Sequence, residues 1–256
     1  MRCADKDPEV AAKGVATGLF GPEVYRSWKS WSEDTFGNLG DVEKRTFQAE
    51  LELAGTPFDE KLRVLEIGFG NGSFATWVKS QGWIYVGTEI DRELVLRARS
   101  RGFDVHDASE ALSVIAAGRR FDLVVAFDVL EHFTLVEIDD FLMRMKNVLA
   151  PGGRFLARFP SGDSPFSRAI QYGDLTHRSI IGSGIITQLA LKAGLHVVQI
   201  RSPAFPILGL GIKRCIRRIG VMLLRILIAR IINLAFHDNR PRIIEPNMVI
   251  VLEMPH

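Results

Sequence analysis

The sequence predicts an open α/β fold in which helices cover both faces of a mostly parallel sheet. Two observations predict this fold. From residue 61 onward, short apolar runs alternate with amphipathic stretches, a pattern typical of the strand–helix units that build parallel sheets. One of these runs leads directly into a glycine-rich turn at residues 68–72 and then into a helical pattern, as occurs where such sheets bind nucleotides.

The composition indicates an ordinary globular domain. Of the 256 residues, 47% are hydrophobic and 24% charged, which excludes the disordered, collagen-like and disulfide-scaffold classes. The two cysteines, Cys3 and Cys215, stand at opposite ends of the chain and form neither a metal-binding pair nor a disulfide framework. No apolar leader follows Met1, so we expect a cytoplasmic protein.

Residues 1–60 form the first predicted unit, a helical extension ahead of the sheet. Four aromatic residues in it recur at near-helical spacing: Tyr25, Trp28, Trp31 and Phe36. Two interpretations of these aromatic residues stay open. They pack into the core, or they belong to a lid that folds over a ligand.

The α/β core is expected to span residues 61–202, with 247–256 as its final strand. The apolar runs predict strands at 62–67, 83–88, 103–106, 121–127, 153–159, 195–201 and 247–253. The stretches between them predict helices at 72–81, 92–100, 108–117, 136–149 and 182–193. Pro151-Gly152-Gly153 is expected to end the fourth of these helices and turn the chain into the next strand. An unusually long insertion, residues 203–246, separates the last two strands.

The glycine-rich turn carries the strongest functional signal. Gly68, Gly70 and Gly72 form GxGxG, whereas a dinucleotide-binding turn has GxGxxG, which places a pyrophosphate at the helix N-terminus. Glu66 precedes the turn and would repel a pyrophosphate, but it suits a cationic amino-acid group. Glu89 ends the second strand, where a carboxylate accepts hydrogen bonds from ribose hydroxyls.

These motifs resemble those of the class I S-adenosylmethionine-dependent methyltransferases, and the resemblance extends from Val64 to Phe159. It implies a Rossmann-like sheet of seven strands with an antiparallel last strand. It also implies S-adenosylmethionine as the cofactor, with Glu66 at its methionine part and Glu89 at its ribose. The other residues that it places around the cofactor are Gly68, Phe69, Gly70, Asn71, Gly72, Ile90, Asp107, Ala108 and Asp128.

Two segments on the ligand side of the sheet hold candidates for the acceptor site. His132 follows the fourth strand in a Leu-Glu-His triplet that is frequent in the family, and histidine is the natural base near neutral pH. Asp174 and His177 lie in an Asp-x-Thr-His sequence like those that border the acceptor pocket of similar small-molecule methyltransferases. We predict catalytic roles for these three residues. Asp128, Asp174 and His177 lack the spacing of a metal site, so we expect no metal.

The residues after the fourth strand also indicate the kind of acceptor. Nucleobase amino-methyltransferases carry an Asn/Asp-Pro-Pro-aromatic motif there, and this chain has Asp128-Val129-Leu130-Glu131 instead. Nucleic acid is therefore not the expected partner. We expect a small hydroxyl or carboxyl compound. The Arg-Phe-Pro segment at 158–160 and the Gly-Asp-x-Thr-His segment at 173–177 resemble those of enzymes that act on sugars of surface polysaccharides.

The insertion concentrates positive charge, because residues 201–242 hold nine Lys and Arg and a single acid, Asp238. Residues 207–236 predict a helix that begins basic and amphipathic and becomes apolar almost all round after Gly220. Such a helix must be covered. The alternatives are burial against the domain, a homodimer, or docking at an anionic membrane surface, which suits a lipid-linked acceptor such as a glycan.

The sequence thus predicts an S-adenosylmethionine-dependent O-methyltransferase for a sugar or other small hydroxyl compound, cytoplasmic or peripheral to the inner face of the membrane. One alternative is a catalytically silent S-adenosylmethionine-binding module that acts at a membrane or in a complex. The other is a nicotinamide-dependent oxidoreductase, which the GxGxG spacing opposes.

Overall fold

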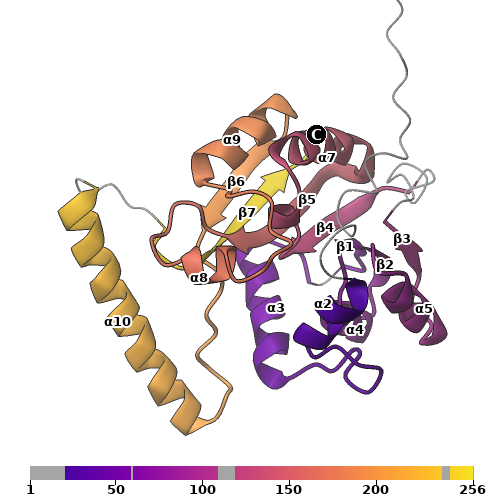
Figure 1. Cartoon of the computed structure of the whole chain (residues 1–256), viewed down its shortest axis with the longest axis horizontal. Helices are drawn as coiled ribbons and strands as arrows, with labels where there is room; N and C mark the ends of the chain where they lie inside the picture. The colour runs from indigo at the N-terminus through magenta and orange to yellow at the C-terminus, as the bar shows by residue number, and fades with distance from the viewer. Residues whose placement is uncertain (1–20, 59, 109–118, 238–242, 256) are drawn as a thin grey trace, which may run out of the picture.

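A sheet of seven strands forms the centre of the molecule (Figure 1). The computed structural model describes residues 21–58, 60–108, 119–237 and 243–255. The strands are β1 (Arg63–Ile67), β2 (Ile84–Glu89), β3 (Val105–Asp107), β4 (Phe121–Phe127), β5 (Leu149–Pro160), β6 (His196–Arg201) and β7 (Asn247–Glu253). They lie in the order β3-β2-β1-β4-β5-β7-β6, with β7 antiparallel to both neighbours and the other pairs parallel. The predicted mostly parallel, Rossmann-like sheet with an antiparallel last strand is confirmed.

The helices surround this sheet as the pattern predicts. They are α2 (Pro22–Trp28), α3 (Asp41–Leu53), α4 (Ser73–Ser80), α5 (Arg92–Ser100), α7 (Leu135–Val148), α8 (Arg168–Gln171), α9 (Ser183–Lys192) and α10 (Ile212–Phe236), with a short 3-10 helix, η1 (Leu130–His132). The helix expected at 108–117 falls, apart from Ala108, outside the described residues.

Both faces of the sheet are buried. Alternate residues of each strand point to opposite faces, so neighbouring residues enter different cores. Along β4, Val124 joins a core that α7 and α9 cover, whereas Val125 joins a second core under α3, α4 and α5. Because β1 to β5 are parallel, the loops that follow their carboxyl ends lie together at one end of the sheet, where open α/β sheets bind their ligands.

The Pro151-Gly152-Gly153 motif differs from its prediction. Helix α7 ends at Val148, and β5 begins at the very next residue, so the motif lies inside the strand. Gly152 adopts a left-handed φ of 71°, and its N–H donates to the carbonyl oxygen of Met254 at 2.9 Å. The pairing of β4 with β5 is irregular here. The chain therefore turns tightly at this motif, as predicted, but it does so inside the bounds of β5 rather than ahead of the strand.

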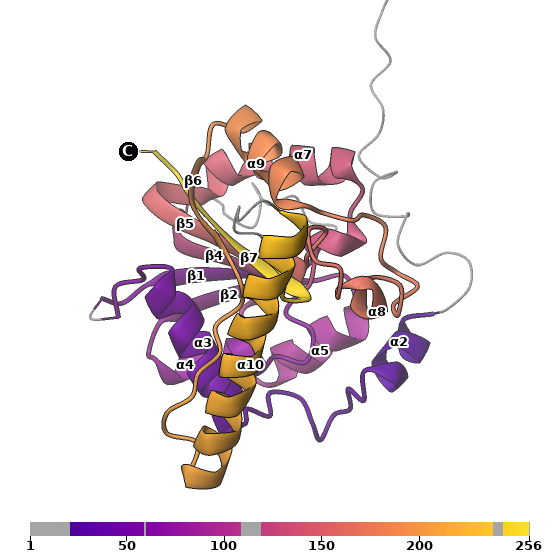
Figure 2. The ribbon, with the colours of Figure 1, turned by 90° about the vertical axis from the view of Figure 1, so that its left-hand side faces the viewer.

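Helix α10 stands to one side of the rest of the domain (Figure 1), and it crosses in front of the sheet when the molecule is viewed from that side (Figure 2). It has no buried residue, and none of its residues belongs to the two buried cores. Its first turns are tied to the preceding segment, since Sγ of Cys215 donates to the carbonyl oxygen of Ile207 at 2.9 Å and Nε of Arg218 to that of Pro206 at 2.6 Å. The alternative that this helix is buried against its own domain is therefore wrong.

Candidate active site

The glycine turn after β1 requires glycine for its backbone and for its packing. Gly68, Gly70 and Gly72 have φ values of 70°, 52° and 72°, in the left-handed region that favours glycine. A Cβ on Gly68 would lie 2.7 Å from Cγ2 of Val129, and one on Gly72 would lie 2.7 Å from Cζ of Phe36. The turn therefore brings backbone N–H groups close to anything bound at this edge of the sheet.

Glu66 is the buried acid at the end of β1, with an exposed fraction of 4%. Burial raises the pKa of Glu66 to about 8, although the hydrogen bond from the Tyr85 hydroxyl, 2.7 Å long, opposes this rise. The neighbouring charge of Glu89 adds to it. A cationic group bound beside Glu66 would offset the cost of its charge, so the residue fits the amino-acid end of S-adenosylmethionine.

Glu89 ends β2 and braces the glycine turn. Its Oε2 accepts from Gly70 N–H at 2.9 Å, and its Oε1 accepts from Ile90 N–H at 2.7 Å and Asp91 N–H at 3.1 Å. Burial raises the pKa of Glu89 despite these three bonds. A carboxylate has about four lone-pair positions, so the predicted contact with ribose hydroxyls would share this carboxylate with the backbone.

The remaining predicted cofactor residues lie around these two acids. Asp107 is paired in register with Glu89, and Ala108 N–H donates to the Glu89 carbonyl oxygen at 2.9 Å, so both residues lie beside the expected ribose position. Phe69 is buried, whereas Ile90 is 49% exposed.

Asp128 follows β4 with a left-handed φ of 57°. Both of its carboxylate oxygens pair with the guanidinium of Arg158, which extends over the ring of Phe127. The structure thus fixes Asp128 by an ion pair to β5 that the sequence did not predict.

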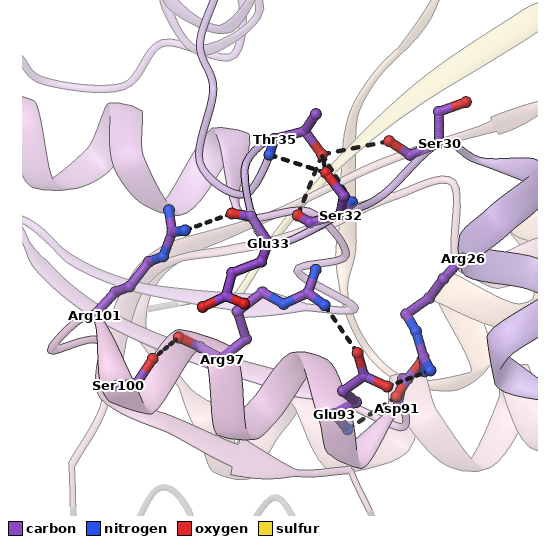
Figure 3. Close-up of polar contacts among 10 residues, drawn as sticks. All are labelled: Arg26, Ser30, Ser32, Glu33, Thr35, Asp91, Glu93, Arg97, Ser100 and Arg101. Carbon is purple, nitrogen blue, oxygen red and sulfur yellow. Dashed lines mark hydrogen bonds and ion pairs between the residues drawn. The ribbon is translucent and has the colours of Figure 1, made fainter.

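The N-terminal segment, residues 21–40, packs over the glycine turn. A Cβ on Gly70 would lie 2.8 Å from Cη2 of Trp31, and the Asn71 side-chain amide donates to the Thr35 carbonyl oxygen at 2.7 Å. Figure 3 shows two further ties: Arg26 pairs with Asp91 and Glu93 at the start of α5, and Arg101 reaches the carbonyl oxygen of Glu33. The segment therefore lies against the turn and the end of β2, which is where the lid interpretation places it.

The three predicted catalytic residues meet in space. The rings of His132 and His177 have centroids 4.9 Å apart, although the residues are on separate segments. Oδ1 of Asp174 accepts from Thr176 Oγ1 at 2.5 Å, and Nδ1 of His132 lies 2.9 Å from the same hydroxyl. Burial lowers the pKa of His132, and the neighbouring His177 adds to the effect. Burial opposes but does not prevent a lowered pKa for Asp174, because its hydrogen bonds from Thr176 prevail.

The structure adds two residues to this cluster. Glu131 has a side chain only 2% exposed, and its Oε1 lies 3.9 Å from Nε2 of His177. Burial, followed by the charge of Asp128, raises the pKa of Glu131 to about 8. Tyr25 lies edge-on to His132, and its pKa is raised by burial and then by Asp174 and Glu89. Glu131 was visible in the Leu-Glu-His triplet and Tyr25 in the aromatic pattern, but neither pattern indicates this proximity.

Comparison with known proteins identifies the family. Residues 41–200 match the model of a family described as a methyltransferase domain. Two curated relatives are named ubiquinone biosynthesis O-methyltransferase. The protein from Brucella anthropi is 30% identical over 39% of this chain, and that from Dinoroseobacter shibae is 29% identical over 56% of it. The matches span 41% and 64% of those relatives' own lengths.

Solved structures share the fold at low sequence identity. An S-adenosylmethionine-dependent methyltransferase from Archaeoglobus fulgidus has a TM-score of 0.57 at 18% identity, covering 82% of this chain and 94% of its own. The magnesium protoporphyrin IX methyltransferase from Synechocystis, with bound S-adenosylhomocysteine, has a TM-score of 0.54 at 11% identity, covering 97% and 100%. The glycine turn, its two buried acids and the match to the family model agree, so the nicotinamide alternative falls away. The chain belongs to the methyltransferase-domain family, and it shares its fold with solved S-adenosylmethionine-dependent methyltransferases.

Proposed function

We propose that this methyltransferase O-methylates a small hydroxyl compound, such as a sugar, that is attached to a lipid. The observation that carries this proposal is the meeting of His132, Asp174 and His177 beside Tyr25, whose hydroxyl is influenced by both Asp174 on the acceptor side and Glu89 on the cofactor side. The charges of Asp174 and Glu89 thus both reach Tyr25, which supports a single site for acceptor and cofactor.

Methyl transfer requires mainly that the acceptor oxygen and the methyl group be held in position. Bound S-adenosylmethionine supplies a methyl group on a sulfonium, which passes in line to the acceptor oxygen while the carbon–sulfur bond breaks and its electrons stay on sulfur. The side chains of the cluster hold the acceptor hydroxyl and take up the proton that it loses. Glu66 and Glu89 would hold the amino-acid and ribose parts of the cofactor, and they would thereby position its methyl group opposite the acceptor.

Helix α10 supports an acceptor on a membrane. It has the length and composition of a helix able to cross a bilayer, carries six Lys and Arg and no acid, and exposes its apolar residues. A basic helix with a large exposed apolar surface binds at anionic bilayers. We infer that α10 docks at the cytoplasmic face of such a membrane.

The names of the two curated relatives favour a second candidate, a phenolic hydroxyl on an isoprenoid lipid. Both candidates present a hydroxyl on a membrane-anchored compound, so one assay separates them.

The test uses S-adenosylmethionine with a labelled methyl group and three acceptors: lipid-linked glycans, isoprenoid catechols and water-soluble sugar nucleotides. We expect label that extracts into organic solvent and survives mild base, since a methyl ether survives and a methyl ester does not. His132→Asn is expected to lose this activity while still binding S-adenosylmethionine. Label on protein or nucleic acid would contradict the proposal. Cofactor binding with no transfer to any acceptor would also contradict it, and would favour the catalytically silent binding module.

A further inference from the structure

We propose that Glu131, His132 and His177 form a binding site for a divalent transition-metal cation such as Zn²⁺. The ligand atoms that these three side chains offer lie within 4.8 Å of one another. The site is enclosed, because the side chains of Glu131 and His177 are only 2% and 6% exposed. One carboxylate and two imidazoles are a ligand set that suits such cations better than Mg²⁺ or Ca²⁺.

A hydrogen bond outside the cluster fixes the proton of His177. Its Nδ1 lies 3.0 Å from the carbonyl oxygen of Gln171, and a carbonyl oxygen only accepts, so Nδ1 carries the hydrogen. Nε2 then presents its lone pair to Oε1 of Glu131 at 3.9 Å and to Oδ2 of Asp174 at 3.8 Å. These separations are too long for hydrogen bonds. Two atoms that bind one tetrahedral metal at about 2 Å lie about 3.3 Å apart, so these side chains need to draw in by only about half an ångström to bind the same ion.

His132 is fixed in the same way through Thr176. The Thr176 hydroxyl lies 2.5 Å from Oδ1 of Asp174, and a carboxylate only accepts, so the hydroxyl hydrogen points to Asp174. The hydroxyl oxygen therefore accepts from Nδ1 of His132 at 2.9 Å. Nε2 of His132 is left with its lone pair. Metal-binding histidines are commonly oriented by such a bond from the other ring nitrogen.

Glu131 supplies the independent sign that a ligand belongs here. Its Oε2 is buried without any hydrogen-bond partner, and Oδ2 of Asp174 is in the same condition. An unpaired buried carboxylate oxygen is costly, and a metal ion bound to it removes the cost. Lys29 lies 3.9 Å from Oδ2 of Asp174 and provides a charge on that side. The charges of Lys29 and Arg158 also reach Glu131, but its Oε2 still has no hydrogen-bond donor among the described residues.

The role of this cation rests on the proposed function, but its binding does not. Three protein ligands leave positions open on the metal, as catalytic sites require. The acceptor oxygen would take one of them, and the cation would lower the pKa of that hydroxyl so that its proton passes to Oδ2 of Asp174, a cluster oxygen that is not a ligand of the metal. This proposal replaces the sequence-based expectation of no metal, which considered Asp128; that residue instead pairs with Arg158.

The experiment uses the full chain without an affinity tag, stripped of metal by a chelator and titrated with Co²⁺ and then Zn²⁺. We expect visible absorption from protein-bound Co²⁺ that Zn²⁺ displaces, and one zinc per chain after dialysis. Glu131→Gln and His177→Gln should weaken binding by more than about 10-fold, the loss caused even by removing an outer partner of a metal ligand. His196→Gln, a change at an exposed histidine that starts β6, is the matched control and should bind as the parent does.

Calorimetry with S-adenosylmethionine shows that each variant is folded. The metal site would be overturned if the parent protein held no stoichiometric metal, or if both site variants bound the metal as tightly as the parent. If the stripped protein binds no cation and still methylates hydroxyl acceptors at full rate, the site is wrong and the proposed function stands. If zinc binds as expected and no hydroxyl acceptor is methylated, the site is supported and the proposed function fails.

Discussion

Glu66 lies at the end of β1 with the hydroxyl of Tyr85 as its partner, in a place where its charge is poorly solvated. Burial raises its pKa to about 8 in the folded protein, above the ordinary value of 4.5 that it regains on unfolding. Between these two values the folded state holds one more proton than the unfolded state. The free energy of unfolding therefore falls as the pH rises through this window.

We predict that Glu66→Gln removes this pH dependence. The parent protein should lose about 1 kcal/mol of stability per pH unit from this group between roughly pH 5 and 8, and the variant should show a flatter profile. Urea unfolding at a series of pH values measures it. Glu60→Gln, at an exposed position, is the control and should leave the profile unchanged; an identical slope in the Glu66 variant would disprove the burial argument.

Gly72 and Gly82 offer a matched pair of substitutions. Both have a φ of 72°, but a Cβ on Gly72 would meet the ring of Phe36 at 2.7 Å, whereas one on Gly82 would meet nothing within 4 Å. Gly82→Ala should cost only the backbone strain, about 1–2 kcal/mol. Gly72→Ala should cost more and should weaken S-adenosylmethionine binding as well. Chemical denaturation and calorimetry test this; equal losses in the two variants would mean that Phe36 yields freely.

At the scale of elements, α10 is the helix whose surface the domain leaves uncovered. Arg214 and Arg217 are exposed on it, whereas Arg218 is engaged with Pro206 and Phe205. We predict that Arg214→Glu combined with Arg217→Glu reduces co-sedimentation with anionic vesicles by about 10-fold or more, since each basic residue near such a surface contributes about 1 kcal/mol. The parent should bind neutral vesicles weakly.

The control for that experiment places the same charge change elsewhere. Lys61→Glu with Arg144→Glu alters two exposed residues outside α10 and should leave vesicle binding close to that of the parent. If both double variants behave alike, net charge explains the binding and α10 does not. A concentration-dependent dimer that both pairs leave intact would favour the homodimer alternative.

The N-terminal segment is held to the domain by ion pairs, a hydrogen bond and aromatic contacts. We predict that S-adenosylmethionine slows amide hydrogen exchange in residues 21–40 together with residues 68–72, because Trp31 lies against Gly70. Mass spectrometry of peptides from both regions measures it. Arg26→Gln, which removes the tie to Asp91, should diminish the protection in the segment more than that in the turn. Protection confined to 68–72 would exclude a lid.

At the scale of the whole molecule, the sheet was predictable because the spacing of apolar residues and the turn residues between the runs are local properties of the chain. Strands β1, β2, β4, β6 and β7 begin and end within about one residue of their predicted bounds. Strand β5 begins earlier than predicted, because Leu149 already pairs with Phe121 of β4 before the chain turns at Pro151 and Gly152. The local pattern shows the turn, but it does not show this pairing between strands.

The active site was predictable only in part, for a related reason. Residues on the ends of strands, such as Glu66 and Glu89, follow from the topology once the strands are known. The contact of Glu131 with His177 joins positions 46 residues apart, and Tyr25 reaches the site from a segment ahead of the sheet. The spacing of residues along the sequence does not indicate such contacts, because they depend on how the loops pack against one another.

The antiparallel placement of β7 between β5 and β6 has a geometrical consequence. The chain leaves β6 and enters β7 at the same edge of the sheet, the edge that carries the glycine turn. If α10 binds a membrane as proposed, both of its connections to the sheet start from the end that carries the glycine turn, and we expect the bound helix to hold that end near the bilayer. Encounter with a lipid acceptor would then be a search in two dimensions, in which the lipid diffuses laterally past the site.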